Sequence, residues 1–263
     1  MHSFPPNLLG DYLHYCSIKN SGEKVGTIDL KEIGWIYPST LLPIVLYLKS
    51  RNLKDFFIKP KKKFVADYID RVLNGNMVRG HSSFPMVTLP TDVKRSGSIL
   101  QDIYSFCDEG KECGGTLAFK YIVGEITTNI YEHSSFSTAL VMAQKYPTKG
   151  FMDICFVDNG ITIAGSFKKV GMLFEDYEAI DAAIRGTSSK MNLERGYGLI
   201  TNINMLAQGY GGSVLIVSGC GAYFYHGNPK GYKLRESTKF DGTLVSMRVP
   251  YPSKEVNLYE YTG

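Results

Sequence analysis

The stretch that most constrains the fold reads EITTNIYEH, and its three polar members are Glu125, Asn129 and His133. They recur every four residues, and that spacing places all three side chains on one face of an α-helix, beside an apolar flank of isoleucines. A carboxylate can orient water, an amide oxygen can bind a hard cation, and an imidazole can hydrogen-bond a neighbour. The same spacing also fits a solvated helix face, so the motifs that follow must decide between the two interpretations.

A second carboxylate is predicted at the end of a strand. Residues 151–157 alternate like a β-strand and run directly into Asp158, Asn159 and Gly160. A carboxylate at a strand end, beside a glycine that lets another backbone approach, is typical of a ligand-binding group. The alternative is a plain turn, in which aspartate and glycine take their usual positions.

Two glycines precede a predicted helix in the C-terminal third of the chain. Gly196 and Gly198 flank Tyr197 and lead into residues 199–207, which have helical spacing. Glycines before a helix leave amide groups and the positive end of the helix dipole open, which suits phosphate, although Gly-x-Gly alone is a weak signal. A helix is also expected at 176–184, with strands at 213–217, 222–225 and 244–249.

The first eighty residues predict strands that alternate with helices, which is the signature of an α/β layer. Strands are expected at 25–30 and 56–58, and helices over 38–49 and 64–73. Residues 1–15 contain two prolines and look irregular, and residues 81–98 resemble a linker. The polar tail after Pro252 is expected to be loosely ordered.

Composition excludes some classes of protein. With 263 residues, 44% hydrophobic and 21% charged, the chain has the make-up of a globular protein of one large or two modest domains. The net charge of +4 is mild, and residues 59–63 (KPKKK) form the only dense basic run. A nucleic-acid surface needs clustered lysine and arginine, so nucleic-acid binding is not expected.

The five cysteines are scattered along the chain and odd in number, which argues against both a disulfide framework and a zinc site. Cys107 and Cys113 lie six residues apart, and no second cysteine or histidine pair accompanies them. The sequence shows neither a signal-peptide pattern nor an apolar run of about 18 residues. We therefore expect reduced thiols, no membrane span and a cytoplasmic protein.

Taken in order, the motifs resemble the GHKL superfamily, which includes gyrase, the large heat-shock chaperones, histidine kinases and mismatch-repair ATPases. The order is a helix with Glu and Asn, a strand ending in Asp-x-Gly, a loop, Gly-x-Gly-Leu opening a helix, two strands, then Gly-Thr and a last strand. The resemblance implies an α/β (α+β) fold for residues 96–263, a GHKL sandwich whose mixed sheet is covered by helices on one face. It also implies ATP and Mg²⁺ as cofactors.

The resemblance assigns roles to the first motifs. Glu125 matches the general base toward water, and Asn129 matches the amide that holds Mg²⁺. Asp158 matches the aspartate that accepts a hydrogen bond from the adenine amino group, and Gly160 matches the glycine beside it. Thr243 matches the threonine that supports the adenine end.

It also assigns roles around the predicted lid over ATP, residues 162–195. Gly196 and Gly198 match the lid glycines whose backbone lies against the phosphates, and Lys190 and Arg195 are candidate phosphate partners. His133 falls where related anti-sigma-factor-type kinases often carry a histidine. Its role is left open, since it can also simply fix the helix end.

One departure from the family pattern concerns nucleotide binding. The usual motif is Asp-x-Gly-x-Gly, and here Thr162 occupies the position of the second glycine. A β-branched residue tolerates a positive φ angle poorly, so a threonine there can crowd the nucleotide or alter the lid hinge.

Residues 1–95 resemble a STAS-type domain, on the strand TIDLKEIGWI and the helix start YPSTLLP. That family carries a phosphorylatable Ser or Thr near this helix start, and Ser39 or Thr40 would match it. The alternative role for both residues is to cap the helix.

The expected function is an ATP-binding regulator of the GHKL type, a nucleotide-dependent protein kinase or ATPase switch that acts on a protein partner. A homodimer is left open. The alternative is a non-catalytic interaction module that has lost ATP binding.

Overall fold

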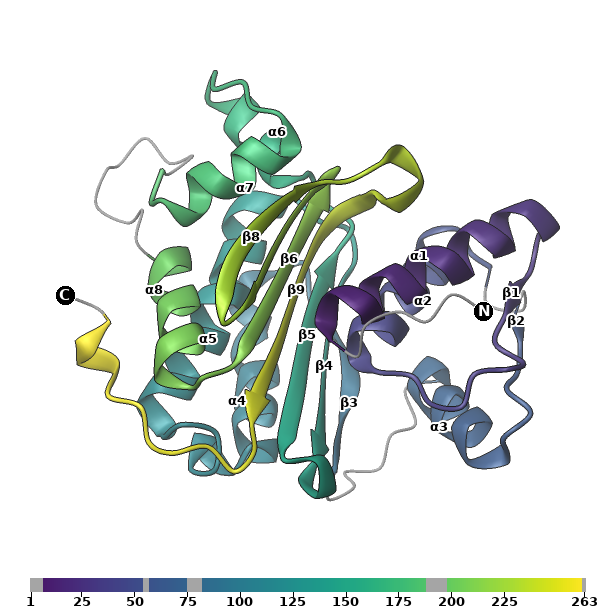
Figure 1. Cartoon of the computed structure of the whole chain (residues 1–263), viewed down its shortest axis with the longest axis horizontal. Coiled ribbons are helices and arrows are strands. Elements are labelled where there is room, and N and C mark those ends of the chain that lie inside the picture. Colours follow the sequence, from purple (N-terminus) through teal and green to yellow (C-terminus); the bar gives the residue numbers. More distant parts are fainter. Residues whose placement is uncertain (1–6, 54–56, 75–81, 188–197, 262–263) are drawn as a thin grey trace.

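The computed structural model describes residues 7–53, 57–74, 82–187 and 198–261 (Figure 1). Within them lie eight α-helices and nine β-strands, so the protein is of mixed α and β structure, as predicted. The helices are α1 (Leu8–Val25), α2 (Pro38–Ser50), α3 (Lys63–Asn74), α4 (Ser96–Phe106), α5 (Thr116–Asn129), α6 (Ile163–Lys169), α7 (Asp176–Ile184) and α8 (Gly198–Asn204). The strands are β1 (Ile28–Asp29), β2 (Phe57–Ile58), β3 (Ser83–Leu89), β4 (Ala139–Tyr146), β5 (Phe151–Asp158), β6 (Ser213–Gly219), β7 (Gly221–His226), β8 (Asn228–Lys233) and β9 (Phe240–Pro250).

A seven-stranded sheet in the order β3-β4-β5-β9-β6-β7-β8 forms the centre of the fold. Each neighbouring pair in it is antiparallel, so the expectation of a mixed sheet is wrong. The reason lies in the connections: β4 and β5 form one hairpin, and β6, β7 and β8 form a meander. The strand β9 then returns to the middle and joins these two parts.

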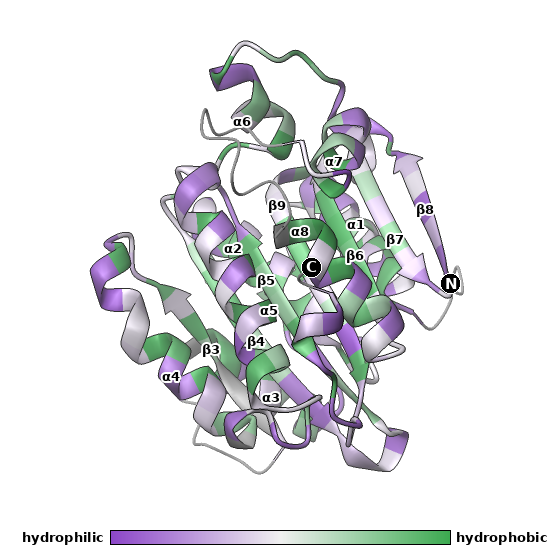
Figure 2. Cartoon of the chain, turned by 90° about the vertical axis from the view of Figure 1, so that its left-hand side faces the viewer, coloured by the Kyte–Doolittle hydropathy of each residue, from purple (hydrophilic) through white to green (hydrophobic). Residues whose placement is uncertain are grey.

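Helices cover the sheet on both faces (Figure 1). The helices α4, α5, α7 and α8, which belong to residues 96–263, pack on one face, as predicted for that part of the chain, and the N-terminal helices α1, α2 and α3 pack on the other. Alternate side chains of β4 and β5 belong to two different hydrophobic clusters, as the period of two in a strand requires. One cluster packs against α1, α2 and α3, and the other packs against α4, α5, α7 and α8. Because both faces are buried, the central strands are mostly hydrophobic along their length (Figure 2).

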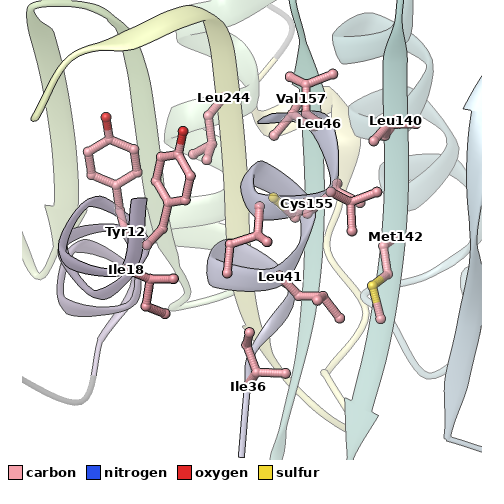
Figure 3. Packing of buried hydrophobic residues seen from close by; sticks show 14 of the residues in the cluster. Tyr12, Ile18, Ile36, Leu41, Leu46, Leu140, Met142, Cys155, Val157 and Leu244 are labelled. Carbon is pink, nitrogen blue, oxygen red and sulfur yellow. The ribbon is translucent and has the colours of Figure 1, made fainter. Parts of the chain in front are cut away.

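The N-terminal helices share their core with the sheet. Figure 3 shows side chains of α1 and α2 against those of the strands: Tyr12, Ile18, Leu41, Leu46, Leu140, Met142, Cys155, Val157 and Leu244. The division of the chain at residues 95 and 96 stays a prediction. The short strands β1 and β2 pair in parallel and lie outside the large sheet.

Two expectations for the N-terminal part are wrong. Residues 8–15, expected to be irregular, belong to α1, which begins after Asn7, whose side chain accepts a hydrogen bond from the backbone N–H of Gly10 (2.9 Å). Part of the expected linker at 81–98 is the edge strand β3, which pairs with β4. The helices α2, α3 and α7 and the strands β5, β6, β7 and β9 lie where the sequence predicts them, within a few residues.

A buried ion network joins α1 to the sheet. The Arg248 guanidinium donates to both oxygens of Asp153 (2.7 and 2.8 Å) and to Asp11 Oδ2 (3.1 Å). Ser39 and Thr40 do not cap α2: the Ser39 hydroxyl donates to Asp11 Oδ2 (3.1 Å) and the Thr40 hydroxyl to the Asp11 carbonyl (2.7 Å). Both hydroxyls are buried, so in this conformation neither is accessible to a kinase.

The C-terminal segment after β9 is held to the rest of the protein, against the expectation of a loose tail. The backbone N–H of Ser253 donates to Glu112 O (2.9 Å), and that of Val256 donates to Gly114 O (2.8 Å). The Val256 side chain is buried in the cluster that contains α5.

Candidate functional site

Three polar side chains lie side by side on three neighbouring strands, β5, β9 and β6, at one end of the sheet. Asp158 of β5 is paired with Thr243 of β9, and Thr243 is paired with Ser218 of β6. The Ser218 and Thr243 hydroxyls are 3.0 Å apart. Continuing the alternation of each strand, all three side chains are on the face of the sheet that α5 covers. The structure thus brings the predicted pair Asp158 and Thr243 together and adds Ser218.

The turn after β5 packs against the end of α5, and this fixes Asp158 relative to that helix. A Cβ atom on Gly160 would lie 2.1 Å from the Ser134 carbonyl oxygen, so only glycine fits this close approach. The same carbonyl accepts a hydrogen bond from the backbone N–H of Ile161 (2.7 Å). The predicted glycine beside the carboxylate is therefore required by packing.

Burial raises the pKa of Asp158 to about 7. Hydrogen bonds from the Gly160 backbone N–H (2.9 Å) and from the Ser134 side chain oppose that rise. The side chain is 2% exposed, and among the described residues it forms no salt bridge. A buried carboxylate that has no cation beside it and titrates near neutrality is typical of a functional site.

The helix α5 presents the predicted polar face toward α8. Burial raises the pKa of Tyr121, one turn before Glu125, and the nearby Thr201 side chain of α8 opposes that rise. Residues four apart share a face of a helix, so Glu125 and Asn129 follow Tyr121 along the side of α5 that is next to α8. Both side chains are half-buried.

His133 lies beyond the regular part of the helix, in a π-helical turn (Ile130–Ser134). Its Nδ1 is 3.4 Å from the Ser166 hydroxyl of α6. The histidine therefore connects the end of α5 to the helix that follows Asp158, which agrees with a role in fixing the helix end.

Thr162 does not adopt the backbone conformation that would strain a β-branched residue. Its φ angle is −68°, and its hydroxyl caps α6 by accepting a hydrogen bond from the Gly165 backbone N–H (3.1 Å). The departure from Asp-x-Gly-x-Gly thus serves as a helix start. The expected backbone conflict is absent.

Three of the predicted lid residues, Lys190, Arg195 and Gly196, lie outside the described residues. The fourth, Gly198, is the first residue of α8.

The helix α8 also contains a buried amide that was not predicted. Asn202 is 1% exposed, and neither of its amide atoms has a hydrogen-bond partner in the part of the chain that the structure describes. The Asn202 side chain could therefore form hydrogen bonds with a water molecule or a ligand that reaches it.

Ser134 and Ser218, which complete the surroundings of Asp158, were not predicted from the sequence. Ser218 also accepts a hydrogen bond from the backbone N–H of Ile163 (2.9 Å), so it holds the start of α6 against the sheet. Its position directly before Gly219 at the end of a predicted strand was the only available signal, and a serine before a glycine is common in turns.

Comparisons with known proteins add no relative. A scan against protein-family models, a search of curated proteins and a search of solved structures each found no match. Among the described residues there is no cluster of three or more histidine, cysteine, aspartate or glutamate side chains that could hold a metal ion. The helices that the structure describes include none with an apolar stretch sufficient to cross a membrane.

Proposed function

We propose that the protein binds an adenine nucleotide with Mg²⁺ between the end of the sheet and the helices α5 and α8, as a regulatory protein of the GHKL type. The observation that carries the proposal is Asp158, a buried carboxylate with no salt bridge to any described residue, in one row with Thr243 and Ser218. A carboxylate in such surroundings has acceptor capacity left for a donor such as an exocyclic amino group.

The adenine end belongs at Asp158 and the phosphates belong toward α5 and α8. Bound Mg²⁺ would supply charge neutralisation of the phosphates. Asn129 would offer it an amide oxygen, which suits a cation that keeps several of its waters when bound. Because the structure has no carboxylate cluster among its described residues, a dedicated protein cage for the metal is not part of the proposal.

Glu125 is the proposed general base. Its carboxylate lies on the same helix face as Asn129, one turn earlier, and can accept a proton from water or from a serine hydroxyl of a partner. Positioning and charge neutralisation do most of the remaining work in phosphoryl transfer. We propose a protein kinase or a slow ATPase switch that acts on a protein partner, with residues 1–95 as a STAS-like part and 96–263 as the nucleotide-binding part.

The non-catalytic alternative had its support in Thr162. That support is weakened by the capping role of this residue, whose φ angle of −68° is ordinary. The alternative is therefore retained only as an outcome of the experiment below.

A thermal-shift measurement tests the proposal. Mg·ATP and Mg·ADP at millimolar concentration should each raise the melting temperature of the wild type, since a ligand that binds only the folded state stabilises it. Asp158→Asn should lose this shift, and Asp67→Asn, an exposed aspartate of α3, should keep it. No shift in a folded wild type would contradict nucleotide binding and leave the interaction module.

Catalysis needs a separate test. Glu125→Gln should keep the thermal shift with Mg·ATP and lose phosphate release or transfer, because it retains the shape of the side chain and removes its basicity. Equal turnover in Glu125→Gln and wild type would show that another group serves as the base.

A further inference from the structure

Three sulfur atoms meet in the core at the start of α5, at the end of the molecule away from Asp158. The Sγ atoms of Cys107 and Cys113 are each 3.9 Å from the Sδ atom of Met152. Each thiol is placed to donate its proton to the thioether sulfur. All three side chains are 0% exposed.

The spacing of the three sulfur atoms is compatible with a shared metal ion. Sulfur atoms that share one cation at bond lengths of about 2.3 Å lie about 4 Å from one another in a three-coordinate site, and the distance from Met152 Sδ to each thiol sulfur is 3.9 Å. Two thiolates and a thioether are soft ligands, and such sets select copper(I) over harder cations. We propose that Cys107, Cys113 and Met152 form a three-coordinate site for a soft monovalent cation of the copper(I) class.

The charge around the cluster supports this assignment. Lys145 is buried, and its ammonium group donates to the Phe106 carbonyl (3.0 Å) and lies over the rings of Phe106 and Tyr251 (4.8 and 5.2 Å). Among the described residues no carboxylate pairs with it. Two thiolates and one monovalent cation carry a net charge of −1, which the Lys145 ammonium group, bound to the carbonyl of the residue before Cys107, would balance.

The three ligands come from rigid parts of the fold. Cys107 ends α4, and Met152 lies in β5, paired on both sides by other strands. Cys113 is held through its carbonyl, which accepts a hydrogen bond from the Tyr210 hydroxyl (2.7 Å). Gly114 packs so closely on Tyr210 that a Cβ atom there would lie 2.2 Å from the ring. A preorganised set of donors of this kind reduces the cost of binding a metal.

Metal binding at this site is a simple exchange. The cation replaces the two thiol protons, which leave to solvent, and no electron is transferred. The site does not depend on the proposed nucleotide site, since α5 separates the sulfur atoms at its start from Glu125 and Asn129 near its end.

The experiment is a copper(I) competition titration of the reduced full-length protein under anaerobic conditions, against a chromophoric copper(I) chelator. The wild type should retain one equivalent, and its X-ray absorption spectrum should show three sulfur neighbours at about 2.3 Å. Cys113→Ser should lose the copper. Met152→Leu, which keeps volume and both thiols, should bind at least about tenfold more weakly.

Cys220→Ser is the matched control, because Cys220 is the most exposed cysteine and lies elsewhere in the fold. It should retain copper as the wild type does. Copper retention that is equal in Met152→Leu, Cys113→Ser and wild type would overturn the site, and so would failure to compete with the chelator. A protein that forms a Cys107–Cys113 disulfide in air but retains no copper when reduced would have a redox pair in place of the metal site.

Discussion

Two buried aspartates on the same strand, Asp153 and Asp158, have opposite surroundings. Asp153 faces the α1 and α2 side of the sheet, where both of its oxygens accept hydrogen bonds from Arg248. Asp158 faces the α5 side, where its Oδ1 accepts a hydrogen bond from the Gly160 backbone N–H (2.9 Å). Burial raises the pKa of both carboxyl groups above the usual value.

The difference distinguishes an aspartate that holds the fold together from one that we propose binds a ligand. Asp153 forms a salt bridge with Arg248. Arg248 also binds Asp11, so this network connects α1 to the sheet. Asp158 forms no salt bridge with any of the described residues, so its carboxylate can accept further hydrogen bonds from a ligand. Burial alone would not have distinguished the two residues.

Removal of Arg248, the cation that Asp153 shares with Asp11, should have the largest effect and tests whether Asp153 has a structural role. Arg248→Ala removes the cation that pairs with the buried Asp153 and Asp11, and we expect a loss of about 3 kcal/mol or more in the free energy of unfolding at pH 8. Urea denaturation measures it. The loss should shrink at pH 5, because burial raises the pKa of Asp11 to about 6 and the protonated carboxyl no longer needs a cation. A loss below about 1 kcal/mol would mean that the network is not structural.

Paired substitutions of the two aspartates sharpen the comparison. Asp153→Asn should lower the free energy of unfolding by about 2 kcal/mol, since it breaks charged hydrogen bonds to Arg248. Asp158→Asn should leave stability unchanged or raise it by about 1 kcal/mol at pH 8. The sign follows from the raised pKa: the unfolded chain loses this proton near pH 3.8 and the folded protein holds it until about pH 7, so stability falls between these values and the loss is complete at pH 8. Equal losses in both variants would remove the distinction.

Nucleotide affinity should depend on pH through the same group. The carboxylate form of Asp158 accepts the proposed hydrogen bond, and with a pKa of about 7 it is about one-tenth populated at pH 6 and nine-tenths at pH 8. We expect about tenfold weaker Mg·ATP binding at pH 6 than at pH 8, measured by calorimetry. The profile of any residual binding in Asp158→Asn should be flat, and a flat profile in the wild type would exclude Asp158 as the acceptor.

The smallest effect is expected for the Ser39 hydroxyl on the structural side. Ser39→Ala removes the hydrogen bond to Asp11 and should cost about 1 kcal/mol of unfolding free energy, without changing Mg·ATP affinity. Ser50→Ala, an exposed hydroxyl at the end of α2, is the control and should change neither quantity. A change in nucleotide affinity for Ser39→Ala would show that the two faces of the sheet are coupled.

Local patterns predicted the parts of the site that depend on local structure. The strand that ends in Asp158 and the turn glycine at Gly160 follow from alternation and turn chemistry within ten residues. The neighbours Thr243 and Ser218 depend on the register of β9 between β5 and β6, which is set by contacts far apart in sequence. For Thr243 the family resemblance supplied what the pattern lacked, and for Ser218 nothing did.

The missed elements also have physical reasons. The buried side of α1 includes Gly10, Asp11 and Lys19, so its apolar repeat is broken in the sequence although the helix is packed. The strand β3 contains Pro85, which argues against a central strand, but β3 is an edge strand with a register shift near this residue. Both elements are defined by what they pack against.

The central place of β9 has a consequence for biosynthesis. Until residues 240–250 have left the ribosome, β5 and β6 each have an unpaired edge, and Asp158 has no Thr243 opposite it. A nascent chain that has completed its first 239 residues thus contains most of the core and no complete site. Such a chain is exposed to aggregation at two open edges, and a ribosome stalled before β9 would carry a product that depends on chaperones.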